Sequence, residues 1–99
     1  MAIVMRFTPR GLTHEKYNQV IKRLEEAGAG APRGRMQHYF FGDKNNLFVS
    51  EIWDSRASFD KFAETMMPIV QEAGIEPGEP VELEIYNMIE GAKSGTAKP

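Results

Sequence analysis

One histidine and one glutamate near the middle of the chain have the residue types and the spacing of an acid–base pair. Residues 36–41 and 47–53 are rich in aromatic and aliphatic side chains and flank a turn-rich segment, which predicts a β-hairpin. In the register that closes this turn, His38 lies opposite Glu51. An imidazole exchanges protons near neutral pH, and a facing carboxylate can orient it. The pair could therefore take a proton from a phenol or an enol.

The same two residues also have a purely structural interpretation. A buried histidine and glutamate that hydrogen-bond to each other satisfy two polar groups without doing any chemistry. One such pair is a weaker catalytic signal than a full constellation of acid, base and anion-stabilising groups. Both interpretations remain open at this point.

Four further side chains are candidates for binding a substrate. An aromatic wall around the pair could be formed by Phe40, Trp53 and Tyr86. Trp53 has a large apolar area and is equally suited to the core. Arg6 could hold an anionic group through its planar guanidinium. Alternatively, Arg6 could pair with one of three carboxylates: Glu51, Glu82 or Glu84.

The elements that must position these residues follow in the order β-α-β-β-α-β. Apolar periodicity predicts strands at 2–8, 36–41, 47–53 and 81–89, with one helix after an N-cap at Thr13 and another after Asp54 or Ser55. Pro68 should kink or restart the second helix. This order predicts a ferredoxin-like α+β fold, in which a four-stranded antiparallel sheet carries two helices on one face.

The hairpin is unusual because both of its faces are apolar. One face carries Met36 (opposite Trp53), His38, Phe40, Val49, Glu51 and Trp53; the other carries Tyr39, Phe41, Phe48 and Ile52. We expect the helices to cover the second set, which leaves the His38 face open, together with Arg6. An open apolar face of this size is uncommon on a monomer. A symmetric homodimer that stacks two such faces would cover it.

Composition limits the class of protein. The 99 residues predict one domain over residues 1–90 and a disordered tail over 91–99. The net charge of −2 gives no general attraction to nucleic acids or anionic membranes, and the weak basic cluster at Arg33 and Arg35 is interpreted as a solvated loop. No stretch is apolar enough for a membrane helix. The chain has no cysteine and no signal-peptide pattern, so a cytoplasmic location is expected.

Metal and cofactor sites have little support in the sequence. The two histidines, His14 and His38, are far apart and have no accompanying ligand motif. The glycines at 28–34 lack the strand and helix that flank a phosphate-binding loop. We therefore expect no metal and no cofactor.

Three segments give the chain a family resemblance. Residues 11–13 (Gly-Leu-Thr) open the first helix, residues 49–59 (Val-Ser-Glu-Ile-Trp-Asp-Ser-Arg-Ala-Ser-Phe) join a strand to a helix, and residues 71–75 (Gln-Glu-Ala-Gly-Ile) precede a glutamate-rich strand. With the element order, these segments resemble the dimeric α+β barrel superfamily of small antibiotic-biosynthesis-monooxygenase-like proteins, over about residues 2–90.

The resemblance implies a homodimer with stacked sheets and a pocket for a small aromatic compound. It also implies an activity among cofactor-free quinone-forming oxygenases, haem-degrading enzymes, isomerases or proteins of no known activity. The haem-degrading branch places a histidine on the second helix, and residues 55–74 contain none. The quinone-forming branch uses Asn, Trp and His side chains, for which Asn87, Trp53 and His38 are the comparable set. A cofactor-independent monooxygenase is therefore expected, with a non-catalytic ligand-binding or dimerisation module as the alternative.

Overall fold

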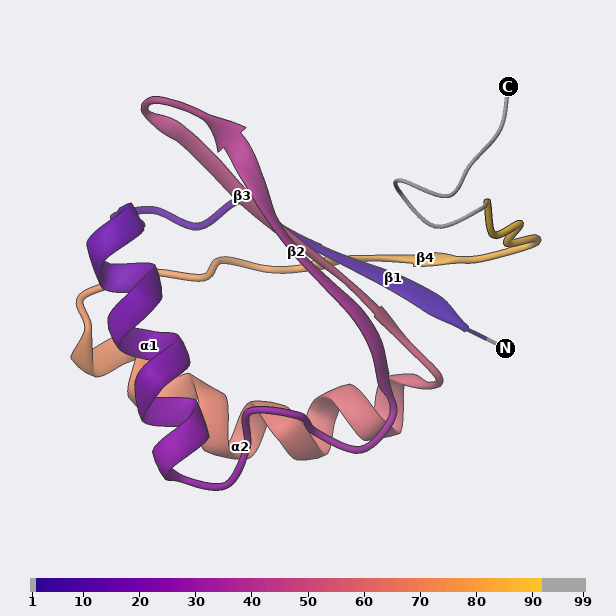
Figure 1. The fold of residues 1–99 in the computed structure, drawn as a ribbon, viewed down its shortest axis with the longest axis horizontal. Coiled ribbons are helices and arrows are strands. Elements are labelled where there is room, and N and C mark those ends of the chain that lie inside the picture. The colour runs from indigo at the N-terminus through magenta and orange to yellow at the C-terminus, as the bar shows by residue number, and fades with distance from the viewer. Residues whose placement is uncertain (1, 92–99) are drawn as a thin grey trace.

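The structure is a computed structural model that describes residues 2–91. It consists of β1 (Ile3–Phe7), α1 (His14–Glu26), β2 (Arg35–Asp43), β3 (Asn46–Trp53), α2 (Arg56–Glu72) and β4 (Val81–Glu84). The four strands form one antiparallel sheet in the order β2-β3-β1-β4. Both helices lie on the same side of this sheet (Figure 1). The predicted ferredoxin-like α+β fold is confirmed.

The helices begin where the sequence predicts. Thr13 accepts a hydrogen bond from the Lys16 amide at 3.0 Å and caps α1. Ser55 accepts one from the Ser58 amide at 3.2 Å and caps α2. Each cap satisfies one of the amide groups that a helix leaves unpaired at its start. Pro68 lies inside α2 and does not divide it into two elements.

The hydrophobic core fills the space between the sheet and the helices. From β1 it takes Ile3, Met5 and Phe7, and from α2 it takes one stripe of apolar side chains that includes Phe59, Phe62, Met66 and Val70. Trp53 is fully buried, with its ring centroid 5.4 Å from that of Phe62. Burying aromatic and aliphatic side chains at this interface is the main force that fixes the helices on the sheet.

The expected assignment of the two hairpin faces is wrong. Glu51 and Trp53 pair across the sheet with Met5 and Ile3, which are core residues. Paired residues of an antiparallel sheet project to the same side, so the His38 face looks toward the helices. The open face carries the other set, with Tyr39 and Phe41 nearly half exposed. In the hairpin alone both faces are apolar, and only the pairing with β1 decides which is covered.

A β-bulge makes the register at the far end of the hairpin differ from the predicted one. The pairs Gly42–Leu47 and His38–Glu51 occur as predicted, but Trp53 lies opposite Arg35 and not Met36. The ladder shifts between Arg35 and Gln37, so Met36 is the extra residue and is 51% exposed. A bulge of one residue reverses the alternation that precedes it. It therefore turns Arg35 toward the helices.

The last strand is shorter than predicted. The sequence pattern predicts a strand over residues 81–89, whereas β4 ends at Glu84. Glu84 pairs with Ile3 at the start of β1, and the Ile85 amide donates to the Ala2 carbonyl at 3.0 Å. Beyond that point β1 offers no further partner for a ladder. The predicted disordered tail, 91–99, lies outside the described residues except for Gly91.

Candidate functional site

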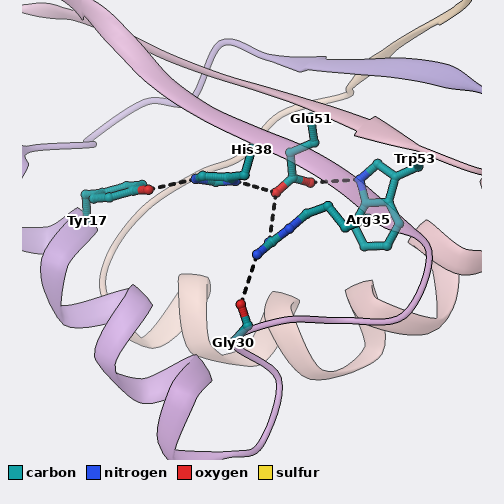
Figure 2. A network of polar contacts seen from close by, with 6 residues as sticks. All are labelled: Tyr17, Gly30, Arg35, His38, Glu51 and Trp53. Atoms are coloured by element: carbon teal, nitrogen blue, oxygen red, sulfur yellow. Dashed lines mark hydrogen bonds and ion pairs between the residues drawn. The ribbon is translucent and has the colours of Figure 1, made fainter. Parts of the chain in front are cut away.

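The predicted pairing of His38 with Glu51 is confirmed. The two residues lie opposite each other on β2 and β3, and His38 Nδ1 is 2.6 Å from Glu51 Oε2. They project from the sheet into the layer between it and the helices (Figure 2). The side chain of Glu51 is 5% exposed and that of His38 is 21% exposed. The pair is therefore shielded from solvent, mostly by the protein's own helices.

Three donors hold the Glu51 carboxylate in place. Oε1 accepts from Trp53 Nε1 at 3.0 Å, and Oε2 accepts from an Arg35 guanidinium nitrogen at 3.3 Å in addition to the His38 contact. Arg35 also donates to the Gly30 carbonyl at 3.0 Å. A buried carboxylate is costly unless it is paired and hydrogen-bonded. Arg35 and Trp53 meet that requirement and fix the orientation of Glu51.

A tyrosine from α1 completes the network. Tyr17 Oη lies 2.7 Å from His38 Nε2 (Figure 2). A carboxylate that already accepts from a cation needs no proton of its own, so Nδ1 of His38 carries the hydrogen that points at Glu51. In the tautomer that carries its hydrogen on Nδ1, Nε2 accepts the hydrogen bond that the Tyr17 hydroxyl donates. The result is a directed chain of hydrogen bonds from Tyr17 through His38 to Glu51.

Burial keeps the tyrosine hydroxyl protonated. It raises the pKa of the Tyr17 phenol above the ordinary value of 10.0; the nearby Arg35 cation opposes this rise, and the Glu51 charge adds to it. The Tyr17 ring is also fixed in position, since it stacks on Phe40 with ring centroids 3.9 Å apart and ring planes 7° apart. Tyr17 is therefore a neutral, oriented donor at neutral pH.

The network opens into a cavity of about 90 Å³ between the sheet and both helices. Its polar lining comprises Tyr17, Arg35, His38 and Glu51, and its apolar lining includes Phe7, Leu12, Val20, Leu24, Phe62 and Ile75. Two backbone hydrogen bonds join Arg10 and Glu76 at 2.8 and 2.9 Å. They hold together the segments around Pro9 and Pro77, which also line the cavity. The cavity is an apolar space with one polar wall.

The structure separates the four predicted substrate-binding residues from this cavity. Trp53 is fully buried and supports Glu51, and Phe40 covers one side of the Tyr17 ring; neither lines the cavity. Arg6 pairs with Ser50 and Val81 and lies exposed on the open face. Tyr86 is 87% exposed and lies after the end of β4. Of the six predicted site residues, only His38 and Glu51 face the cavity.

Two residues of the network are missing from the sequence-based site. Tyr17 belongs to the apolar stripe of the first helix, and its spacing there marks it only as a core residue. Arg35 lies two residues after Arg33 in a loop-like stretch, and the bulge that turns it inward has no clear sequence signature. One signal was present in β1. Its alternation of Ile3, Met5 and Phe7 with Arg6 marks the covered face, to which β3 then aligns Glu51.

Among residues 2–91, no group of three or more His, Asp or Glu side chains is arranged to hold a metal ion. Within the same residues, none of the helices has the length and apolar character needed to cross a bilayer.

Comparison with known proteins identifies relatives in structure only. No family model matches the chain, and no curated protein matches it in sequence. SnoaB, a cofactor-independent oxygenase from Streptomyces nogalater, has a similar structure with a TM-score of 0.58 and 19% sequence identity, over 89% of this chain and 94% of that one. A protein of Deinococcus radiodurans, provisionally assigned as an antibiotic biosynthesis monooxygenase, gives 0.57 at 11% identity, over 94% and 100% of the two chains.

The same fold also occurs in a protein with a different activity. A heme-degrading protein from Mycobacterium tuberculosis, in its heme-free form, gives a TM-score of 0.50 at 14% identity, over 91% of this chain and 100% of that one. A fold that carries several activities does not by itself select one of them. The chain shares its α+β fold with these proteins.

Proposed function

We propose that this protein is a cofactor-independent monooxygenase that acts on a small phenolic or enolic aromatic compound. The observation that carries the proposal is the hydrogen-bonded chain Tyr17–His38–Glu51, which ends at an apolar cavity. A histidine oriented by a carboxylate is a general base. The likeness in fold to a cofactor-independent oxygenase supports this class of chemistry.

The proposed reaction uses molecular oxygen as its co-substrate. His38 takes the proton of the substrate hydroxyl, and the electron-rich ring then donates an electron pair to O₂ and forms a carbon–oxygen bond. At a ring methylene, loss of water from the resulting peroxide leaves a carbonyl. The balance is R₂CH₂ + O₂ → R₂C=O + H₂O, with the proton held on His38 returned to the oxygen atom that leaves. Glu51 stabilises the imidazolium formed between these steps.

Oxygen consumption with a panel of small hydroxylated aromatic compounds tests the proposal. His38→Gln should lower turnover by roughly 10²–10⁴-fold, the usual contribution of a general base. The chain has a second histidine, His14, which is exposed on α1, so His14→Gln is the matched control and should retain activity. Equal rates for His38→Gln and the unmodified protein would show that His38 is not the base.

The size of the cavity favours a second candidate function. At about 90 Å³ it is smaller than the roughly 300 Å³ at which ordinary small-molecule sites begin. In a non-catalytic module the network would only satisfy buried polar groups and fix α1 on the sheet. This alternative predicts that His38→Leu changes the stability of the protein but neither its oxygen consumption nor its association. A bound compound that shifts the His38 ring resonances would exclude a purely structural role for the network, and turnover that depends on His38 would exclude a non-catalytic module altogether.

We also propose that a second copy of the chain covers the open face of the sheet. Four of the large apolar side chains of this face are about half exposed: Tyr39, Phe41, Val81 and Leu83. Such a face is costly in water, and a symmetric dimer buries it twice. The sequence resemblance implies the same arrangement. The absence of cysteine in the sequence suits a reducing compartment, so we propose a cytoplasmic location for this dimer.

Sedimentation at several protein concentrations tests the dimer. Leu83→Lys places a charge on the open face and should shift the protein to monomers. Gln19→Lys adds the same charge on the exposed side of α1 and should leave the association unchanged. A monomeric unmodified protein at all concentrations, or a dimer that Leu83→Lys does not weaken, would contradict the proposal.

A further inference from the structure

We propose that Tyr17 is the residue that contacts the substrate hydroxyl and passes its proton to His38, and that the substrate is an uncharged phenol or enol. The proposal rests on the proposed function, because it assigns roles within the same site. It goes beyond that function by moving the point of contact from the histidine to a tyrosine on another element.

The first argument is that His38 has no free nitrogen. Nδ1 is bonded to Glu51 at 2.6 Å and Nε2 to Tyr17 at 2.7 Å. A substrate that reached Nε2 directly would have to displace the Tyr17 hydroxyl. The stacking of Tyr17 on Phe40 at 3.9 Å opposes that displacement. The Tyr17 oxygen, and not the imidazole, is therefore the atom of this hydrogen-bonded network that can accept a hydrogen bond from a substrate.

The second argument is that a tyrosine hydroxyl donates one hydrogen bond and accepts others. Its single hydrogen points to His38, so its lone pairs are available to an incoming O–H group from the cavity that Tyr17 lines. As the substrate proton moves to Tyr17 Oη, the Tyr17 proton moves to His38 Nε2. The products are a substrate oxyanion and an imidazolium facing Glu51, while Tyr17 regains one proton for the one that it loses. Since burial raises the pKa of Tyr17, the two transfers are expected to be concerted and to avoid a free tyrosinate.

The third argument concerns the charge of the substrate. The charged groups that line the cavity are Arg35 and Glu51, and they are paired with each other. Arg35 donates in addition to the Gly30 carbonyl, and Trp53 donates to the remaining carboxylate oxygen. An incoming carboxylate would therefore meet a cation that is already neutralised and apolar walls. The site is suited to a neutral ring that carries a hydroxyl group.

Nuclear magnetic resonance with two probes, phenol and 4-hydroxybenzoate, tests the binding part of the proposal. Phenol should bind and shift the His38 ring nitrogen resonances, which are assigned by comparison with His14→Gln. 4-Hydroxybenzoate should bind at least roughly tenfold more weakly, because burying its charge without a partner is costly. Failure of phenol to shift His38, or equal binding of the two probes, would overturn the proposed substrate class.

A tyrosine-to-phenylalanine variant tests the relay. Tyr17→Phe keeps the ring and its stacking, and should weaken phenol binding roughly two- to tenfold, as expected for one lost hydrogen bond. With a turned-over substrate it should lower kcat by roughly 10²-fold. Tyr39→Phe on the open face is the matched control and should change neither value.

The outcomes separate this inference from the proposed function. If His38→Gln abolishes turnover while Tyr17→Phe retains or increases it, the substrate reaches Nε2 directly and the relay is wrong. If neither variant alters turnover, the proposed function is wrong, and the phenol titration of Tyr17→Phe still decides whether Tyr17 contacts a ligand. Phenol binding unchanged by Tyr17→Phe would exclude that contact.

Discussion

Both faces of the sheet are apolar, but polar side chains are buried and hydrogen-bonded on one face and exposed to solvent on the other. On the face toward the helices, Glu51 is buried and every hydrogen-bonding atom of the described buried side chains has a partner. On the open face, Arg6 is exposed to solvent, and the aromatic side chains of the same face, Tyr39 and Phe41, are about half exposed. The first face is complete within one chain. The second leaves several large apolar side chains about half exposed.

This difference explains where chemistry can occur. A buried carboxylate becomes a precise orienting group only if several donors fix it, and the covered face supplies Arg35, Trp53 and His38. The open face offers area and no buried polar network, which is typical of a contact between subunits. Five predictions test this comparison.

The largest effect is expected from removing the centre of the network. Glu51→Ala leaves the Arg35 guanidinium and the Trp53 indole N–H buried without their carboxylate partner, and should lower the free energy of unfolding by about 3–5 kcal/mol. Urea denaturation measures it. Glu64→Gln, at an exposed position of α2, is the control and should change stability by about 0.5 kcal/mol or less.

A double substitution sharpens this prediction. Replacing Arg35 and Glu51 together by leucine removes both charges. The loss of stability should therefore be smaller than the sum of the losses measured for Arg35→Leu and Glu51→Leu separately. Strict additivity would mean that the 3.3 Å ion pair contributes nothing to the covered face.

The next effect is expected at Trp53. Trp53→Phe removes the hydrogen bond to Glu51 Oε1 and leaves a gap beside Phe59 and Phe62, and should cost about 2–3 kcal/mol. The loss should appear as a lower urea midpoint. A change below about 0.5 kcal/mol would show that the contact to the carboxylate is dispensable.

A smaller effect is expected on the open face. Phe48→Ala removes a half-buried ring whose centroid lies 5.6 Å from that of Phe41, and should cost about 1 kcal/mol in dilute protein. If a second copy covers this face, the cost should grow with protein concentration, because association stabilises the unmodified protein more. Thermal unfolding over a hundredfold range of concentration gives the answer. A cost independent of concentration would separate this face from any interface.

The smallest effect is a change in the response to alkaline pH. The pKa of Tyr17 is raised in the folded protein, so the folded state holds this proton more tightly than the unfolded state. The resulting stability is fully present below the unfolded value of 10.0 and is lost as the pH rises through the folded value. Tyr17→Phe should therefore lose less stability above pH 10.0 than the unmodified protein. Parallel curves for the two proteins would show that Tyr17 does not titrate differently on folding.

The sequence pattern was sufficient for the parts of the site that depend on local spacing. The turn between β2 and β3 fixes the register near it, and this placed His38 opposite Glu51. It failed at the far end of the hairpin arms, where the bulge inserts Met36 and brings Arg35 opposite Trp53. It also failed for Tyr17, because a tyrosine in an apolar helical stripe looks the same whether its hydroxyl meets water or an imidazole.

The sequence by itself determined the order of the elements, the α+β fold, and, apart from Arg35 and Met36 at the bulge, the residues that share each face of the hairpin. These follow from periods of two and of 3.6 residues, which are properties of the local backbone. The hairpin is apolar on both sides, so its own pattern does not say which face the helices cover. Only the tertiary structure decided this, through the pairing of β3 with β1, which aligns Glu51 and Trp53 with the core residues Met5 and Ile3. It alone brought Tyr17 to His38, across 21 residues of chain, and turned Arg35 onto Glu51. Those contacts depend on how α1 is seated on the sheet and on one inserted residue, and neither is encoded in local periodicity.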